Sequence, residues 1–190
     1  MTNIYLVGFM GTGKTSVGMG LARKMKRRFI DLDDLIEMRE GRRICDIFAQ
    51  EGEPYFRRVE HRILKEVSRE KNFVVACGGG IVINKDNINI MKESGEVICL
   101  TASIPVILRR IEGTSHRPLL NVKNPQEQIE CLLKLRAPFY ALADKSIDTS
   151  QLSIDEVIGK IIRFLGKEKN KSSRKNRKPV SKRRIKVKKI

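Results

Sequence analysis

Short apolar runs alternate with amphipathic stretches along most of the chain. The apolar runs predict five strands, at residues 3–8, 29–31, 73–76, 97–100 and 146–148. Apolar residues at helical spacing predict helices between them, at about 15–26, 33–40, 44–51, 54–69, 86–93, 104–111, 125–141 and 153–165. Short strands that are apolar on both faces and alternate with helices indicate an α/β fold, in which helices cover a parallel sheet. We find no internal repeat.

The first predicted strand leads directly into GFMGTGKTS, residues 8–16. This stretch satisfies the phosphate-loop pattern and lies between a strand and a helix, which is the context that the motif requires. Glycines let the backbone curl so that N–H groups point at phosphate oxygens, and the start of the helix adds its positive end. Lys14 supplies a charge for the β- and γ-phosphates, and the Thr15 hydroxyl can ligate Mg²⁺. The stretch therefore predicts a nucleoside triphosphate site.

Two carboxylates follow the second predicted strand. Asp31 and Asp33 lie two residues apart, so on an extended chain they point the same way. Ligands of a parallel sheet bind at the carboxyl edge of its strands. One carboxylate can therefore serve a metal ion and the other a substrate hydroxyl. The alternative is that Asp33 or Asp34 only caps the next helix, a position that aspartate favours.

Three further features leave their roles open. Arg57 lies on a predicted helix, where an arginine is usually a solvated surface residue. The triplet Gly78, Gly79 and Gly80 follows the strand FVVA after Cys77. It either binds an oxyanion through backbone N–H groups or forms only a flexible turn. The loop around His116 and Arg117 follows a helix that carries Arg109 and Arg110. A mobile arginine there would stabilise charge near a γ-phosphate. His116, taken alone, is more typical of an exposed loop residue than of a catalyst.

The strong positive charge is concentrated at the C-terminus. The net charge is +17, and residues 167–190 contribute +12 through 13 Lys or Arg and the single acid Glu168, which leaves +5 for the rest. This segment has no aromatic residue and little apolar content, so it cannot offset the entropy of ordering. We expect a domain at residues 1–166 and a basic, disordered tail at residues 167–190. The tail is either a solvated extension or a loose contact for polyanions.

The remaining composition favours a cytoplasmic protein. Its four cysteines are far apart, which predicts reduced and mostly buried thiols rather than a zinc site. No apolar run reaches the length of a membrane helix, and the N-terminus does not resemble a secretory signal. A chain of 190 residues suits one domain. Because no extra hydrophobic segment suggests an interface, we expect a monomer.

The motifs together resemble the shikimate kinases. GFMGTGKTS, DLDD, DIFAQEGEPYFRRVE, CGGGIV, RPLL and LRAPFY occur in that family's order and at near-family spacing over roughly residues 1–165. The resemblance implies a three-layer α/β/α P-loop kinase fold, with a five-stranded parallel sheet of order 2-3-1-4-5 and a mobile lid. It also implies transfer of the ATP γ-phosphate to the 3-hydroxyl of shikimate, a step of chorismate and aromatic amino acid biosynthesis.

The resemblance implies which residues bind ATP and its metal ion. Thr15 would ligate Mg²⁺, and Asp31 would hold it through water. Arg117 resembles the lid arginine that reaches the phosphates, and Arg110 resembles the arginine stacked on adenine. The residues implied for ATP are Gly11, Thr12, Gly13, Lys14, Thr15, Ser16, Arg110 and Arg117. The loop at 148–152 lacks the proline that often stacks on the other face of adenine.

The resemblance also implies a shikimate site. Asp33 resembles the residue that binds the substrate hydroxyls and accepts a proton, so Lys14, Asp33 and Arg117 are the implied catalytic residues. Arg57 and Arg136 resemble the pair that binds the substrate carboxylate, for which the guanidinium fork is suited. Gly78, Gly79 and Gly80 resemble the loop against the substrate ring.

Other classes of function remain as alternatives. A kinase of the same fold that acts on gluconate or a nucleotide differs only in its acceptor. A GTPase would need an Asn-Lys-x-Asp guanine reader, and the nearest string, residues 84–87, fails at its fourth position. A nucleic-acid-binding module would need stacking aromatics beside the basic tail, and none is present.

Overall fold

The computed structural model describes residues 2–112 and 124–175, and its elements alternate between strands and helices as the sequence predicts. The strands are β1 (Asn3–Val7), β2 (Arg28–Asp31), β3 (Phe73–Ala76), β4 (Gly95–Thr101) and β5 (Lys145–Asp148). The helices are α1 (Lys14–Met25), α2 (Leu32–Glu40), α3 (Ile44–Arg69), α4 (Lys85–Ser94), α5 (Ile104–Ile111), α6 (Pro125–Tyr140) and α7 (Ile154–Lys175), with a 3₁₀ turn η1 (Ile81–Ile83).

The five strands form one parallel sheet in the order β2-β3-β1-β4-β5, which confirms the predicted fold class and strand order. The register aligns the carboxyl ends of the strands. Asp31 of β2 pairs with Ala76 of β3, and Thr101 of β4 pairs with Asp148 of β5. The loops that follow these strands therefore meet at one edge of the sheet.

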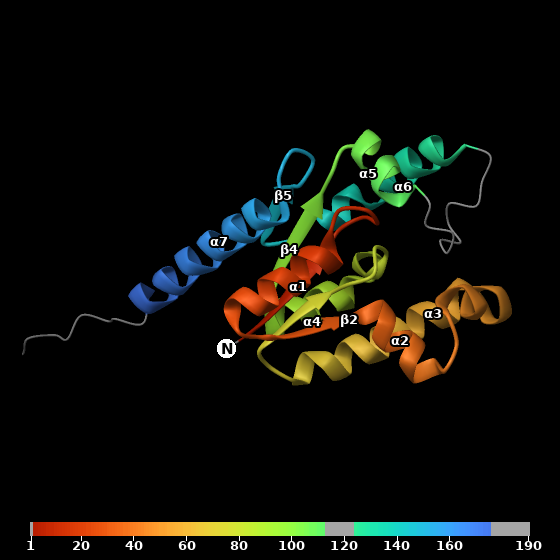
Figure 1. The fold of residues 1–190 in the computed structure, drawn as a ribbon. Coiled ribbons are helices and arrows are strands. Elements are labelled where there is room, and N and C mark those ends of the chain that lie inside the picture. Colours follow the sequence, from red (N-terminus) through yellow and green to blue (C-terminus); the bar gives the residue numbers. More distant parts are fainter. Residues whose placement is uncertain (1, 113–123, 176–190) are drawn as a thin grey trace, which may run out of the picture.

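Alternating side chains of the strands build a core on each face of the sheet. Ile4 and Leu6 of β1 pack with α1 and α7, while Tyr5 and Val7 pack with α2, α3 and α4. This arrangement gives the expected three layers (Figure 1). A smaller cluster, which includes Phe9, joins the loop after β1 to α5 and α6 beyond the carboxyl end of β4.

The two helices predicted at 44–51 and 54–69 form the single run α3, with a break at Gly52, where φ is 78° and ψ is 170°. At the other end of the chain, α7 continues to Lys175, past Gly166, where the sequence placed the domain boundary. The boundary itself stays a prediction. No helix within the described ranges, these two included, is long and apolar enough to cross a membrane.

Candidate active site

The phosphate loop joins β1 to α1 at the carboxyl edge of the sheet. Gly8, Gly11 and Gly13 have positive φ angles of 135°, 75° and 93°. A Cβ atom at Gly8 would overlap the carbonyl oxygen of Leu100 in β4, so the loop backbone packs directly against the backbone of that strand. The Thr12 hydroxyl donates to the Phe9 carbonyl at 2.7 Å. These contacts fix the loop, and α1 begins immediately after it.

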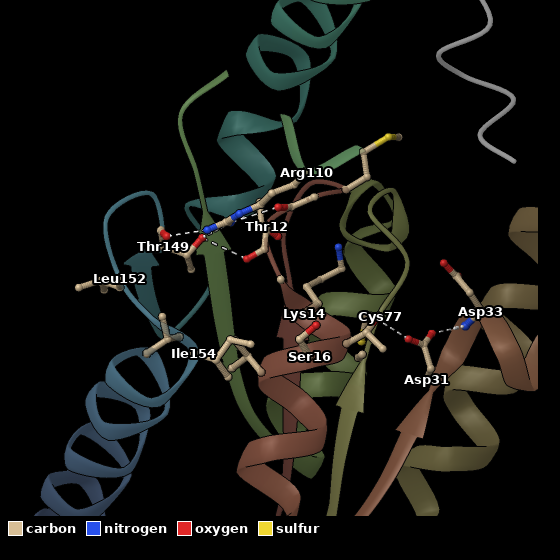
Figure 2. A pocket seen from close by; sticks show the side chains of 17 residues that line it. Thr12, Lys14, Ser16, Asp31, Asp33, Cys77, Arg110, Thr149, Leu152 and Ile154 are labelled. Carbon is tan, nitrogen blue, oxygen red and sulfur yellow. Dashed lines mark hydrogen bonds between the residues drawn. The ribbon is translucent and has the colours of Figure 1, made fainter. Parts of the chain in front are cut away.

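A cavity of about 470 Å³ opens at this loop and is lined by every residue of 10–17. Figure 2 shows Asp31 and Asp33 on one side of Lys14, and Arg110 with Thr149 on the other. The Lys14 ammonium donates to the Phe9 carbonyl at 2.9 Å, which holds it over the loop. The structure thus brings the predicted ATP residues of the loop together around one cavity at the positive end of α1.

Asp31 and Asp33, at the end of β2 and the start of α2, have different structural roles. Asp31, rather than Asp33 or Asp34, is the N-cap of α2, because its carboxylate accepts the N–H of Asp33 at 3.1 Å. Its other oxygen accepts the Thr15 hydroxyl at 2.8 Å. The Asp33 side chain is therefore not the cap, and it lines the cavity. Asp34 also lies in the first turn, where burial, Asp31 and Glu37 raise the pKa of its carboxyl.

Thr15 and Asp31 place two oxygen ligands side by side on the cavity wall. Mg²⁺ is usually held by one or two protein oxygens together with waters and substrate phosphates, so this pair fits that ion. Within the described residues, no group of three or more His, Cys, Asp or Glu side chains is placed to hold a metal. A pair of this kind suits a metal that arrives with a nucleotide, whose phosphates supply further oxygen ligands.

A second region begins where the Gly78–Gly80 loop leaves β3. The Arg57 guanidinium, on α3, donates to Glu60 at 2.7 Å and to Glu53 at 2.9 and 3.1 Å. A Cβ atom at Gly80 would overlap this guanidinium. Arg57 is thus a substantially buried residue held against the glycine loop, not a solvated residue of the helix surface.

Glu60 is a buried carboxyl group on the apolar face of α3. Its Oε2 atom accepts from Arg57, whereas its Oε1 atom has no hydrogen-bond partner among the described residues. Burial raises the pKa of Glu60 to about 7, although the Arg57 guanidinium opposes this shift. A Cβ atom at Gly78 would lie 2.7 Å from Glu60 Oε1 and 2.9 Å from Asp33 Oδ1.

Arg136 reaches the same loop from α6. Its side chain is buried, and its guanidinium carbon lies 5.7 Å from the centroid of the Phe9 ring. Its Nη1 atom lies 3.6 Å from the Cβ position at Gly79, and its buried Nε atom has no hydrogen-bond partner among the described residues. Arg57 and Arg136 therefore both lie against the glycine loop, and each places a guanidinium group beside it.

Arg110 closes the other end of the cavity. It donates to the Gly11 carbonyl at 3.2 Å and to the Thr149 hydroxyl and carbonyl at 3.0 and 2.9 Å. Leu152 and Ile154, from the segment after β5, line the same end. In this structure the segment thus contributes aliphatic side chains, consistent with the missing proline. Arg117 and His116, and the lid predicted there, lie outside the described residues.

Sequence reasoning missed three residues that contact the predicted site. Glu60 had a signal, since it is a carboxylate on the face of α3 that also carries Phe56, Ile63 and Leu64. Tyr140, whose hydroxyl donates to the Gly79 carbonyl at 2.7 Å, ends the LRAPFY motif, but the motif did not indicate its contact with the glycine loop. Thr149 holds Arg110 to the phosphate loop, and the sequence did not indicate this contact either, because the partners of Thr149 are far away along the chain.

Comparisons with known proteins agree on one family. The family model described as shikimate kinase matches residues 10–166. A shikimate kinase of Thermoanaerobacter pseudethanolicus is 48% identical over 163 residues, which cover 86% of this chain and 95% of that protein. A solved shikimate kinase of Acinetobacter baumannii in complex with shikimate matches with a TM-score of 0.86 and 39% identity, over 89% of this chain and 95% of that one.

A more distant similarity bears on the alternative acceptors. A solved gluconokinase of Sinorhizobium meliloti matches with a TM-score of 0.59 and 18% identity, over 92% of this chain and 97% of that one. At this identity the similarity shows a shared fold and nothing about the acceptor.

Proposed function

The chain belongs to the shikimate kinase family, and we propose that the phosphate-loop cavity and the glycine-loop region bind ATP and shikimate. Its activity is that of an ATP-dependent kinase, which transfers the γ-phosphate of ATP to the 3-hydroxyl of shikimate in aromatic amino acid biosynthesis. The residue assignments that follow are our proposal, and they rest on the geometry of the two regions.

The position of Asp33 carries the proposal. Its carboxylate lines the ATP cavity and also lies against Gly78, the first residue of the glycine loop. A hydroxyl bound to Asp33 would therefore lie between the two regions, facing the terminal phosphate. Asp33 accepts the hydroxyl proton while the new oxygen–phosphorus bond forms and the bond to the β–γ bridging oxygen breaks, releasing ADP. Such a transfer depends on positioning and charge neutralisation, which Lys14 supplies at the loop.

The other residues orient the two substrates. Arg57 and Arg136 bind the carboxylate of shikimate on either side of the glycine loop, and Arg110 binds the adenine end of ATP. Thr15 and Asp31 are the residues that would hold Mg²⁺, which neutralises phosphate charge when bound. We assign Arg117 to the phosphates by resemblance alone.

The first experiment measures ADP release with ATP, Mg²⁺ and shikimate, against reactions that contain no acceptor, gluconate or a nucleoside monophosphate. Shikimate-dependent turnover is expected. Turnover only with gluconate or a nucleotide would keep the phosphate-loop kinase and overturn the acceptor.

The matching variant is Asp33→Asn, which keeps the side-chain shape and removes the base. We expect kcat to fall by about 10²- to 10⁴-fold, the usual range for loss of a general base. The melting temperature should stay close to that of the wild type. An unchanged kcat would remove Asp33 from the chemistry.

We also propose that the protein is a cytoplasmic monomer. Its four cysteines are all unbridged, which suits a reducing compartment. Light scattering during gel filtration tests the oligomeric state, and a dimer mass would contradict the proposal. We expect no specific nucleic-acid target, and only loose polyanion binding by the basic tail.

A further inference from the structure

The loop that must hold the substrate ring has no side chains with which to anchor itself. Residues 78–80 are all glycine, and a free glycine backbone loses more conformational entropy on ordering than any other residue. The carbonyls of its first and last glycines are hydrogen-bonded to residues that directly follow the loop. The Gly78 carbonyl accepts the N–H of Ile81 at 3.2 Å, and the Gly80 carbonyl accepts the N–H of Ile83 at 3.1 Å. The middle carbonyl, of Gly79, needs a partner from elsewhere.

That partner is Tyr140, at the end of α6. Its hydroxyl donates to the Gly79 carbonyl at 2.7 Å across 61 residues of sequence. The ring is buried, and burial raises the pKa of Tyr140 to about 12, against the opposing effect of the Arg136 guanidinium. The phenol therefore stays protonated, and remains a donor, at every pH at which a kinase would be assayed.

Arg136 lies one helical turn before Tyr140, on the same face of α6, and both are buried. The helix thus contributes the cation beside Gly79 and the hydrogen bond that fixes Gly79. The segment after the loop is held separately, because the buried Asn87 amide donates to the Ile81 carbonyl at 3.0 Å.

The hydrogen bond from Tyr140 also fixes the backbone beside Arg57, through the peptide bond between Gly79 and Gly80. In a trans peptide the C=O and the next N–H point in opposite directions. When the Gly79 carbonyl is fixed toward Tyr140, the Gly80 N–H is turned away from Tyr140. Gly80 is also the residue that packs against the Arg57 guanidinium. One hydrogen bond thereby fixes a peptide plane that lies between the two arginines.

We propose that Tyr140 is a positioning residue for the acceptor substrate, which sets the orientation of the Gly79–Gly80 peptide between Arg57 and Arg136. Tyr140 does not line the phosphate-loop cavity, so we expect its effect to be confined to the acceptor side. This inference rests on the proposed function of the glycine-loop region.

The test compares Tyr140→Phe with Tyr5→Phe. The Tyr5 hydroxyl is also buried and bonded, at 2.7 Å to Ser94, but it lies in the sheet and not at the glycine loop. The Tyr5 hydroxyl also accepts the Asn3 amide at 3.1 Å. Each variant therefore loses a buried phenolic hydroxyl and the hydrogen bonds that it makes. Steady-state kinetics with varied shikimate and varied ATP would separate the two KM values. Hydrogen–deuterium exchange of the peptide containing residues 77–83 would report the mobility of the loop directly.

Loss of one hydrogen bond weakens an interaction by about 3- to 10-fold, and we expect that increase in the shikimate KM of Tyr140→Phe. Its ATP KM should be unchanged, and exchange in the loop should be faster. Tyr5→Phe should lower the melting temperature while both KM values stay at wild-type levels.

Equal changes in the two variants, equal changes in both KM values, or unaltered exchange of the loop would overturn the inference. Should Tyr140→Phe be too unstable for kinetics, the exchange of residues 77–83 at low temperature would still decide. A wild-type protein without shikimate turnover would contradict the proposed function. A wild type that turns over with a normal Tyr140→Phe would contradict only the role of Tyr140.

Discussion

Arg57 is engaged by two carboxylates that differ in exposure. Glu60 is enclosed, whereas the side chain of Glu53 is 47% exposed and occupies two of the five guanidinium donors. A substrate carboxylate would compete with Glu53 for those donors. We therefore expect Glu53→Gln to lower the shikimate KM by up to about 5-fold, since an exposed ion pair contributes about 0–1 kcal/mol.

Glu51→Gln is the matched control for that measurement. Glu51 lies on the same helix and pairs with Arg42 at 3.3 Å, not with Arg57. Its shikimate KM should equal that of the wild type. A rise in KM for Glu53→Gln would mean that Glu53 orients Arg57 instead of competing for it.

The buried Glu60 makes stability depend on pH. Its pKa of about 7 in the folded protein exceeds its ordinary value of 4.5. The folded state therefore holds a proton that the unfolded state releases between these values. The resulting stabilisation is complete below about pH 4.5 and is lost as the pH rises to about 7. We expect the free energy of unfolding of the wild type, relative to Glu60→Gln, to fall over this window.

Urea titrations of both proteins at intervals from pH 4.5 to 8 would measure this difference. A difference that rises with pH would indicate that Glu60 is ionised throughout and that its pair with Arg57 dominates.

At the scale of single residues, the sequence predicted the cavity well and the contacts around the glycine loop poorly. Lys14, Thr15 and Asp31 lie within short motifs whose spacing reflects their geometry. Glu60 and Tyr140 act through contacts that depend on how α3 and α6 pack against the loop. Such contacts are tertiary, and the periodicity of a single sequence does not encode their partners.

At the scale of elements, agreement between pattern and structure is close where a segment has a strong hydrophobic pattern. The four residues of β3 match their prediction because they are apolar throughout and a glycine triplet begins one residue after Cys77. The end of α7 does not match. The sequence predicted that this helix ends at about residue 165, but it runs to Lys175, and the spacing of apolar residues alone does not define where a helix ends.

The break within α3 gives a test at this scale. Gly52 has φ and ψ angles that are essentially restricted to glycine, so Gly52→Ala should destabilise the protein by about 1–3 kcal/mol. Gly159 in α7 is the opposite case, with no atom within 4 Å of its Cβ position. There alanine should stabilise by about 0.5–1 kcal/mol. Chemical denaturation measures both, and the same sign for the two would contradict the assignment of the break.

At the scale of the whole molecule, the family match and most of the net positive charge lie in different parts of the chain. The family match ends at residue 166, and residues 167–190 carry +12 of the net charge. We expect a chain that ends at Lys175 to retain wild-type kcat and both KM values, with weaker retention on a heparin column. A large loss of activity would instead assign the C-terminal segment a part in catalysis.

A chain that ends at Lys160 is the contrasting control. It lacks Ile161 and Leu165, which are buried against the sheet together with Ile4 and Leu6. This shorter chain should lose its cooperative unfolding transition. If it kept that transition, α7 would not be part of the core.

The contact between Gly8 and the Leu100 carbonyl constrains how this protein can diverge. The backbone of Gly8 packs directly against the backbone of Leu100. Replacing Leu100 by a smaller residue would therefore not make room for a side chain at position 8. Most core positions can drift in compensated pairs, but this one has no compensating partner. Descendants of this gene that keep a working enzyme should therefore keep a glycine codon at position 8, even where the surrounding side chains change.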